Sequence, residues 1–133
     1  MEDFVPFQIA KKIKEKGFSC EYPFAMYNED GLFFPLYSSD KYYYGIEDFD
    51  KHDYIAPTIS QVLKWLRKEK DMHIEIFLYN GTYSYHVKSI TKIYEDLYFH
   101  VHKYLNEDTT GIEYETYELA ALSGIEYVLD NLL

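Results

Sequence analysis

The chain has 133 residues, a single cysteine and a net charge of −10, and 16 tyrosines stand among aromatic residues that make up 20% of it. This length predicts one α+β domain over residues 1–133, and a lone cysteine excludes an internal disulfide. The acidic excess disfavours direct nucleic-acid binding, and with no long apolar run we expect neither a secretory signal nor a membrane span, hence a cytoplasmic protein.

The first predicted elements are a helix and a hairpin. Residues 6–18 carry an apolar stripe at helical spacing, which Pro6 can begin and Gly17 can end in a left-handed conformation. A turn at residues 28–31 joins two apolar runs, and Pro35 in the second run indicates an edge strand.

The middle of the chain predicts a loop and then the clearest helix. Residues 40–54, DKYYYGIEDFDKHDY, show no clear period and predict a loop. In residues 56–70, Thr58 and Gln61 have the spacing of a capping box. The apolar stripe of this helix falls at i, i+3, i+4 and i+7, on Ile59, Val62, Leu63 and Leu66.

Asn80-Gly81 separates two alternating runs and predicts a two-residue hairpin turn. This turn places Glu75 opposite His86. One face of the hairpin must then be buried, and its residues are Ile74, Ile76, Leu78, Tyr83, Tyr85 and Val87.

Residues 97–105 predict a further strand, and residues 116–133 predict a helix capped by Thr116. Gly124 inside this helix costs up to about 1 kcal/mol relative to alanine, which indicates close packing against a neighbour. The whole chain therefore predicts an α+β fold, with an antiparallel sheet of about five strands, three helices on one face, and the order α-β-β-α-β-β-β-α.

The polar face of this sheet offers a candidate metal site. Imidazoles and a carboxylate that share one face suit a transition metal. The candidate ligands are His73, Glu75, His86, His100 and His102. The alternative is that they are ordinary polar side chains facing water. A metal-dependent enzyme on this face is one hypothesis, but no catalytic motif is present, so we expect a non-enzymatic protein without a cofactor.

The predicted loop combines aromatic side chains with negative charge, which suits docking on a basic protein. Its candidate partner-binding residues are Tyr42, Tyr43, Tyr44, Glu47, Asp48 and Asp50. The alternatives are a loop without a partner and an inhibitor that mimics nucleic acid, in which carboxylates replace phosphates. The surplus of aromatic residues also fits a homodimer, with a monomer as the alternative.

The stretches KIKEKGFSCEYPFAMYNEDGLFF and IAPTISQVLKWLRKEKDMHIEIF, with the acidic C-terminal helix after YETYELA, resemble small uncharacterised proteins of phages and mobile elements from gut bacteria. The most specific part is Ala56-Pro57-Thr58 leading into residues 63–67. This group has no established activity, so the resemblance implies only a context. We expect a non-enzymatic accessory protein that binds another protein through an acidic, tyrosine-rich surface.

Overall fold

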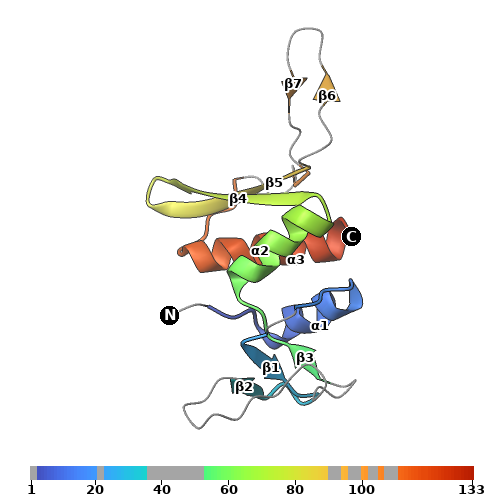
Figure 1. Cartoon of the computed structure of the whole chain (residues 1–133). Helices are drawn as coiled ribbons and strands as arrows, with labels where there is room; N and C mark the ends of the chain where they lie inside the picture. Colours follow the sequence, from blue (N-terminus) through green and yellow to red (C-terminus); the bar gives the residue numbers. More distant parts are fainter. Residues whose placement is uncertain are drawn as a thin grey trace. The chain divides into compact units, whose positions relative to one another are not determined.

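The computed structural model contains three helices and antiparallel strands, which confirms the predicted α+β class (Figure 1). It describes residues 3–20, 23–35, 53–89, 94–95, 100–101, 105–106 and 111–133. The helices are α1 (Phe7–Glu15), α2 (Ile59–Glu69) and α3 (Tyr117–Asn131). The strands are β1 (Ala25–Tyr27), β2 (Phe33–Pro35), β3 (Tyr54–Ile55), β4 (Met72–Tyr79), β5 (Thr82–Ser89), β6 (Tyr94–Glu95) and β7 (His100–Val101).

The strands form separate sheets rather than the single sheet expected from the sequence. One sheet has the order β2-β1-β3, β4 pairs with β5, and β6 pairs with β7. Strands β4 and β5, and likewise β1 and β2, pair across the turn that joins them. Alternation in a sequence does not determine how one hairpin pairs with another strand or hairpin. Of the strand predicted over residues 97–105, the structure describes only His100–Val101 as strand.

The chain divides into two compact units, Met1–Ile59 and Ser60–Leu133. The expectation of one domain stays a prediction. Among the described residues, no helix is both long and apolar enough to cross a membrane.

Helix α1 ends in the left-handed conformation that the sequence predicts. Gly17 has a φ of +88°. Its N–H donates to the carbonyl of Lys14 at 3.2 Å, and the N–H of Phe18 donates to the carbonyl of Ile13 at 2.9 Å. This pair of bonds satisfies two carbonyls that a helix end would otherwise leave without partners.

The three-stranded sheet begins with the predicted turn. The side-chain oxygen of Asn28 accepts from the N–H groups of Asp30 at 2.9 Å and Leu32 at 3.0 Å. Gly31 supplies the positive φ, +85°, that this turn requires. The strand that contains Pro35, β2, is an edge strand, as predicted. The third strand, β3, was not expected, because its first residue lies in the segment that the sequence predicts as a loop.

Helix α1 packs on one face of this sheet. The Phe7 ring lies 5.4 Å from the ring centroids of both Tyr27 and Tyr54. The hydroxyl of Tyr27 donates to the carbonyl of Val5 at 2.6 Å. These contacts bury Tyr27, and burial raises the pKa of its phenol.

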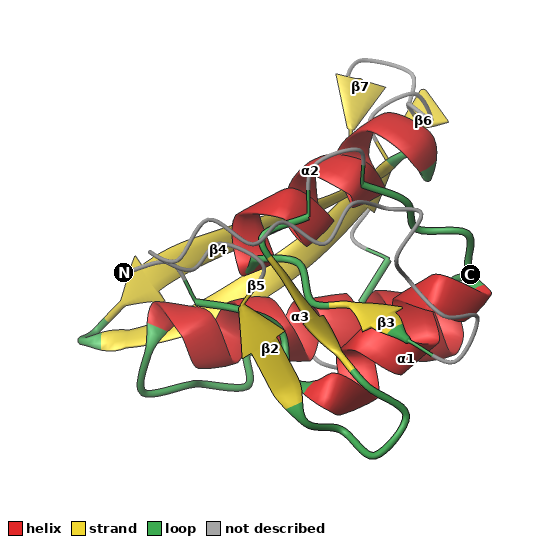
Figure 2. Cartoon of the chain, turned by 60° about the horizontal axis from the view of Figure 1, so that its bottom comes forward, coloured by secondary structure: helices red, strands yellow, loops and turns green. Residues whose placement is uncertain are grey.

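In the second unit, β4 and β5 form the predicted hairpin. Asn80 and Gly81 have φ values of 51° and 82°, the conformation of a type I′ turn. Glu75 lies opposite His86, as the turn predicts. Helices α2 and α3 lie on the same face of this hairpin (Figures 1 and 2).

The predicted inside–outside alternation of the hairpin is confirmed near the helices and fails near the turn. Ile74, Tyr85 and Val87 are 5%, 2% and 0% exposed. Leu78 shares their face but is 63% exposed, because the turn end of the hairpin extends past the helices (Figure 1).

Helix α3 begins and packs as predicted. The hydroxyl of Thr116 accepts from the N–H of Leu119 at 3.1 Å and caps the helix. Gly124 lies directly against the hairpin. A Cβ atom added there would lie 2.8 Å from Cγ2 of Ile74 and 3.2 Å from the Tyr85 ring.

The outer edge of β5, away from β4, is closed by three residues that follow in the chain: Leu105, whose N–H donates to the carbonyl of Val87 at 2.7 Å, Asn106 and Tyr114. The backbone N–H and carbonyl of Tyr83 both bond to Tyr114, at 2.8 and 2.7 Å. The side chain of Asn106, which is wholly buried, accepts from the N–H of Val87 at 2.7 Å and donates to the carbonyl of Tyr85 at 3.0 Å. The amide of Asn106 therefore stands where a neighbouring strand would otherwise pair.

Candidate functional site

The sequence-predicted partner-binding residues all lie outside the described residues. They are Tyr42, Tyr43, Tyr44, Glu47, Asp48 and Asp50. Along the chain this segment joins β2 to β3. Strands β2 and β3 therefore border this segment on either side.

Part of the predicted histidine face is described. Glu75 and His86 lie opposite each other on β4 and β5, and His73 lies two residues before Glu75. Lys88, opposite His73, forms an ion pair with the Glu75 carboxylate at 2.5 Å. The ring of Phe77 lies 4.6 Å from that of His86, so an aromatic contact crosses the same face.

This arrangement does not gather metal ligands in the described part of the chain. No three His, Cys, Asp or Glu side chains among the described residues are placed to hold one ion. Glu75 is instead engaged by Lys88, which would compete with a cation for its oxygens. For His100 only the backbone is described, and His102 lies outside the described residues.

The same face buries polar atoms that have no hydrogen-bond partner. In the described chain these atoms are Nδ1 of His73 and the hydroxyl of Ser84. Ser84 is only 5% exposed, although its alternation places it on the side away from the helices. A serine nucleophile needs a base within hydrogen-bond distance, and Ser84 contacts none.

Charge and burial shift the protonation of this face. Burial lowers the pKa of His73, nearby Arg67 and Lys88 lower it further, and Glu75 opposes them. Burial also lowers the pKa of His86. The hydrogen bond from Lys88 lowers the pKa of Glu75. At neutral pH the face therefore carries neutral imidazoles beside one ion pair.

We predict that replacing His73 and His86 by glutamine flattens the dependence of stability on pH. Both folded-state pKa values lie below the ordinary 6.5, so the unfolded chain binds more protons as the pH falls through 6.5. The free energy of unfolding of the natural protein should therefore decrease in this range, and the double variant should lose less. Urea unfolding at pH 7.5 and 5.5 measures both; equal losses would contradict the prediction.

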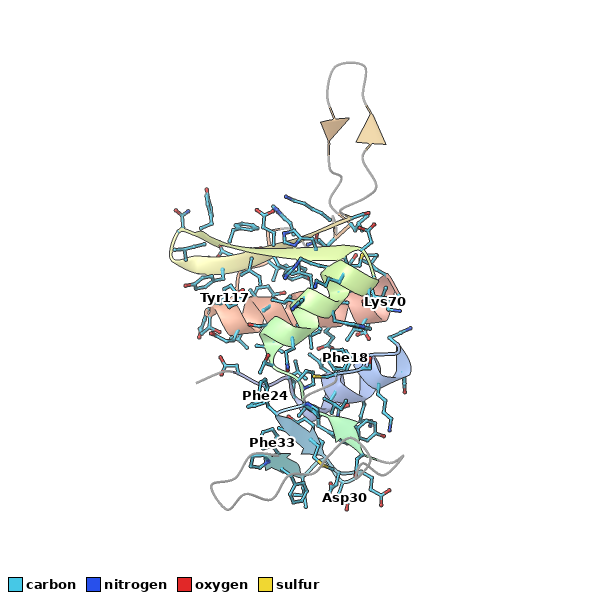
Figure 3. The ribbon with its side chains drawn as sticks, in the orientation of Figure 1. Phe18, Phe24, Asp30, Phe33, Lys70 and Tyr117 are labelled. Atoms are coloured by element: carbon cyan, nitrogen blue, oxygen red, sulfur yellow. The ribbon has the colours of Figure 1, made fainter. Side chains whose placement is uncertain are left out.

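A second candidate surface lies on the β1–β2 hairpin, where four large apolar side chains are exposed. They are Phe24 (43%), Leu32 (59%), Phe33 (43%) and Phe34 (44%). Of these, we call Phe24, Leu32 and Phe34 the apolar hairpin surface. Phe33 lies in the opposite row, where its ring centroid is 5.6 Å from that of Tyr27 and 5.2 Å from that of Phe4. Figure 3 shows Phe24 and Phe33 on the β2 side of this sheet and Asp30 near its turn.

Strand pairing explains why this surface is open. Tyr27 pairs with Phe33 and Tyr54 and faces the helix, whereas Met26 pairs with Phe34 and Ile55 on the opposite face. This second row is entirely apolar, and its side chains are exposed or half-buried. A sheet covered on one side normally presents polar side chains on the other.

The sequence contained a signal for this surface that alternation alone overlooks. Leu32, Phe33 and Phe34 form a continuous apolar run, which is typical of a strand with two apolar faces. Asn106 had no comparable signal, because an asparagine at the start of the polar run of residues 106–108 is typical of a turn.

Comparison with known proteins gives no relative: no family model matches the chain, and neither a curated protein nor a solved structure is detectably similar.

Proposed function

We propose that this chain is a cytoplasmic, non-enzymatic accessory protein of a phage or mobile element, which acts by binding a basic protein. The observation that carries the binding proposal is the apolar hairpin surface. The resemblance of the sequence to phage and mobile-element proteins supports its biological context.

The size and clustering of the exposed side chains support a protein partner. Scattered apolar residues are ordinary on a protein surface, but here Leu32 and Phe34 are exposed on the same face of the sheet as the apolar Met26 and Ile55. Phenylalanine side chains of this kind supply much of the energy of protein interfaces because they bury large areas with few rotatable bonds.

The charge around this surface favours a basic partner. Glu29 and Asp30 are exposed in the turn next to Leu32. Of the lysines described in this unit, Lys11, Lys12 and Lys14 belong to α1, which covers the other face of the sheet, and Lys16 directly follows it. The acidic and tyrosine-rich residues 42–50 follow β2 in the chain, and we include them in the proposed surface.

Affinity capture from a lysate of gut bacteria tests the proposal. The tagged natural protein should retain a basic protein, and a variant with Leu32→Ser and Phe34→Ser should retain at least about tenfold less, since each lost anchor is worth more than 1 kcal/mol. Captured proteins are quantified by mass spectrometry.

The matched control is Leu119→Ser. Leu119 is similarly exposed, at 49%, but lies on α3. Its substitution should leave capture unchanged. Equal capture by the natural protein and the Leu32/Phe34 variant would contradict the proposal. So would a loss of capture caused by Leu119→Ser but not by the Leu32/Phe34 variant.

A further inference from the structure

In the described part of the chain, the β5 edge of the β4–β5 hairpin is hydrogen-bonded to later residues, and the β4 edge has no such partner. The backbone N–H and carbonyl of Tyr83 both bond to Tyr114, so these groups are directed away from β4. In an antiparallel pair, the N–H and carbonyl of its partner Leu78 must then be directed away from β5. By the same alternation, Ile74 and Ile76 also direct their N–H and carbonyl groups outward from β4.

No described residue pairs with this outer edge of β4. The described chain forms only two isolated bridges, Phe4 with Thr58 and Tyr83 with Tyr114, and neither involves β4. The sequence of β4, MHIEIFLY, has no proline or lysine, the residues that commonly protect an edge. Within the described residues, β5 is thus closed by a buried asparagine, and the eight-residue β4 has no partner on its outer edge.

Positive charge lies beside the first part of this edge. Lys64, Arg67 and Lys68 are exposed on α2, and no ion pair engages them in the described chain. Only two residues separate the end of α2 from β4. Arg67 is near enough to His73 to lower the pKa of its imidazole. At the far end of the edge, by contrast, Leu78 is apolar and 63% exposed.

We propose that the outer edge of β4 binds an extended segment of another protein by strand addition, with acidic residues beside α2 and apolar residues beside Leu78. Main-chain hydrogen bonds to Ile74, Ile76 and Leu78 supply the pairing, and the charge of α2 sets the direction. A second copy of this chain fits less well, because antiparallel pairing would place the cations of each α2 beside the apolar Leu78 of the other copy rather than beside acidic residues. The net charge of −10 does not prevent local attraction, since it is screened beyond about 8 Å at physiological salt.

Amide hydrogen exchange followed by NMR tests this proposal residue by residue. The probe is a synthetic peptide, Thr-Val-Thr-Val-Asp-Val-Asp, which an antiparallel pairing would place with its acids beside α2. The N–H groups of Ile74, Ile76 and Leu78 should exchange quickly in the free protein and slowly with the peptide. Those of Glu75 and Phe77, already bonded to β5, should change little.

Matched variants separate the backbone contribution from the charge. Leu78→Pro removes an outward N–H and should weaken binding, whereas Leu78→Ala keeps the N–H and should weaken it less. A peptide with lysine in place of aspartate should bind at least about tenfold more weakly, a difference of 1.4 kcal/mol. Arg67→Glu should reverse that preference.

Two results would overturn the proposal. One is unchanged exchange of the three outward amides at peptide concentrations up to about 1 mM, the weakest affinity considered. The other is protection of these amides in the free protein together with a dimer in sedimentation, which would assign the edge to a second copy.

Discussion

Replacing Asn106 by leucine is expected to lower the free energy of unfolding by about 2–5 kcal/mol, because two buried backbone groups lose their partners. The N–H of Val87 and the carbonyl of Tyr85 both bond to the Asn106 side chain, which is wholly buried. Leucine has the same number and branching of side-chain heavy atoms but neither donor nor acceptor. Urea denaturation of the two proteins at pH 7 measures the difference.

Asn106→Asp provides a control with a defined pH dependence. A carboxylate can accept from the N–H of Val87 but repels the carbonyl of Tyr85, whereas a protonated carboxyl can donate to that carbonyl. Burial raises the folded-state pKa of such a group, so its stability should be greatest at low pH and lost as the pH rises. A leucine variant within about 0.5 kcal/mol of the natural protein would contradict this role for Asn106.

Replacing Gly124 by leucine is expected to destabilise the second unit by about 3 kcal/mol, the upper range for overpacking a core. Even the first added carbon would lie 2.8 Å from Ile74 and 3.2 Å from Tyr85, both of which are buried. Gly124→Ala should cost less, because alanine adds only one carbon at this contact and still gains about 1 kcal/mol of helix propensity over glycine. Thermal and urea unfolding provide the measurements.

A double-mutant cycle shows whether the cost comes from this contact. Ile74→Ala removes the atom nearest to the added carbon, so Gly124→Ala should be less destabilising in that background. Ser123→Ala, in the same helix, controls for propensity alone. If Gly124→Ala stabilises the natural protein as much as Ser123→Ala does, the close packing is disproved.

Local features of this fold could be predicted from the sequence because their causes are local. Asn80-Gly81 selects one turn type, and that turn alone determines which residue faces which across the hairpin. Gly17 and Thr116 mark helix ends because each satisfies backbone groups within a few residues.

Features that depend on distant parts of the chain could not be predicted in this way. The histidines alternate in the sequence, but whether strands from different hairpins share a sheet depends on packing between them. Leu78 has the right alternation for burial and is exposed because the helices stop short of it. Asn106 pairs with residues 19 and 21 positions earlier, at a distance that no local pattern records.

Photo-crosslinking from residue 34 tests the proposed binding surface most directly. A protein carrying benzoylphenylalanine in place of Phe34 should, when illuminated in a bacterial lysate, crosslink to a basic protein. The same group in place of Leu119, which is also exposed, should not crosslink to that protein. Crosslinks from position 119 with none from position 34 would contradict the assignment of partner binding to the apolar hairpin surface.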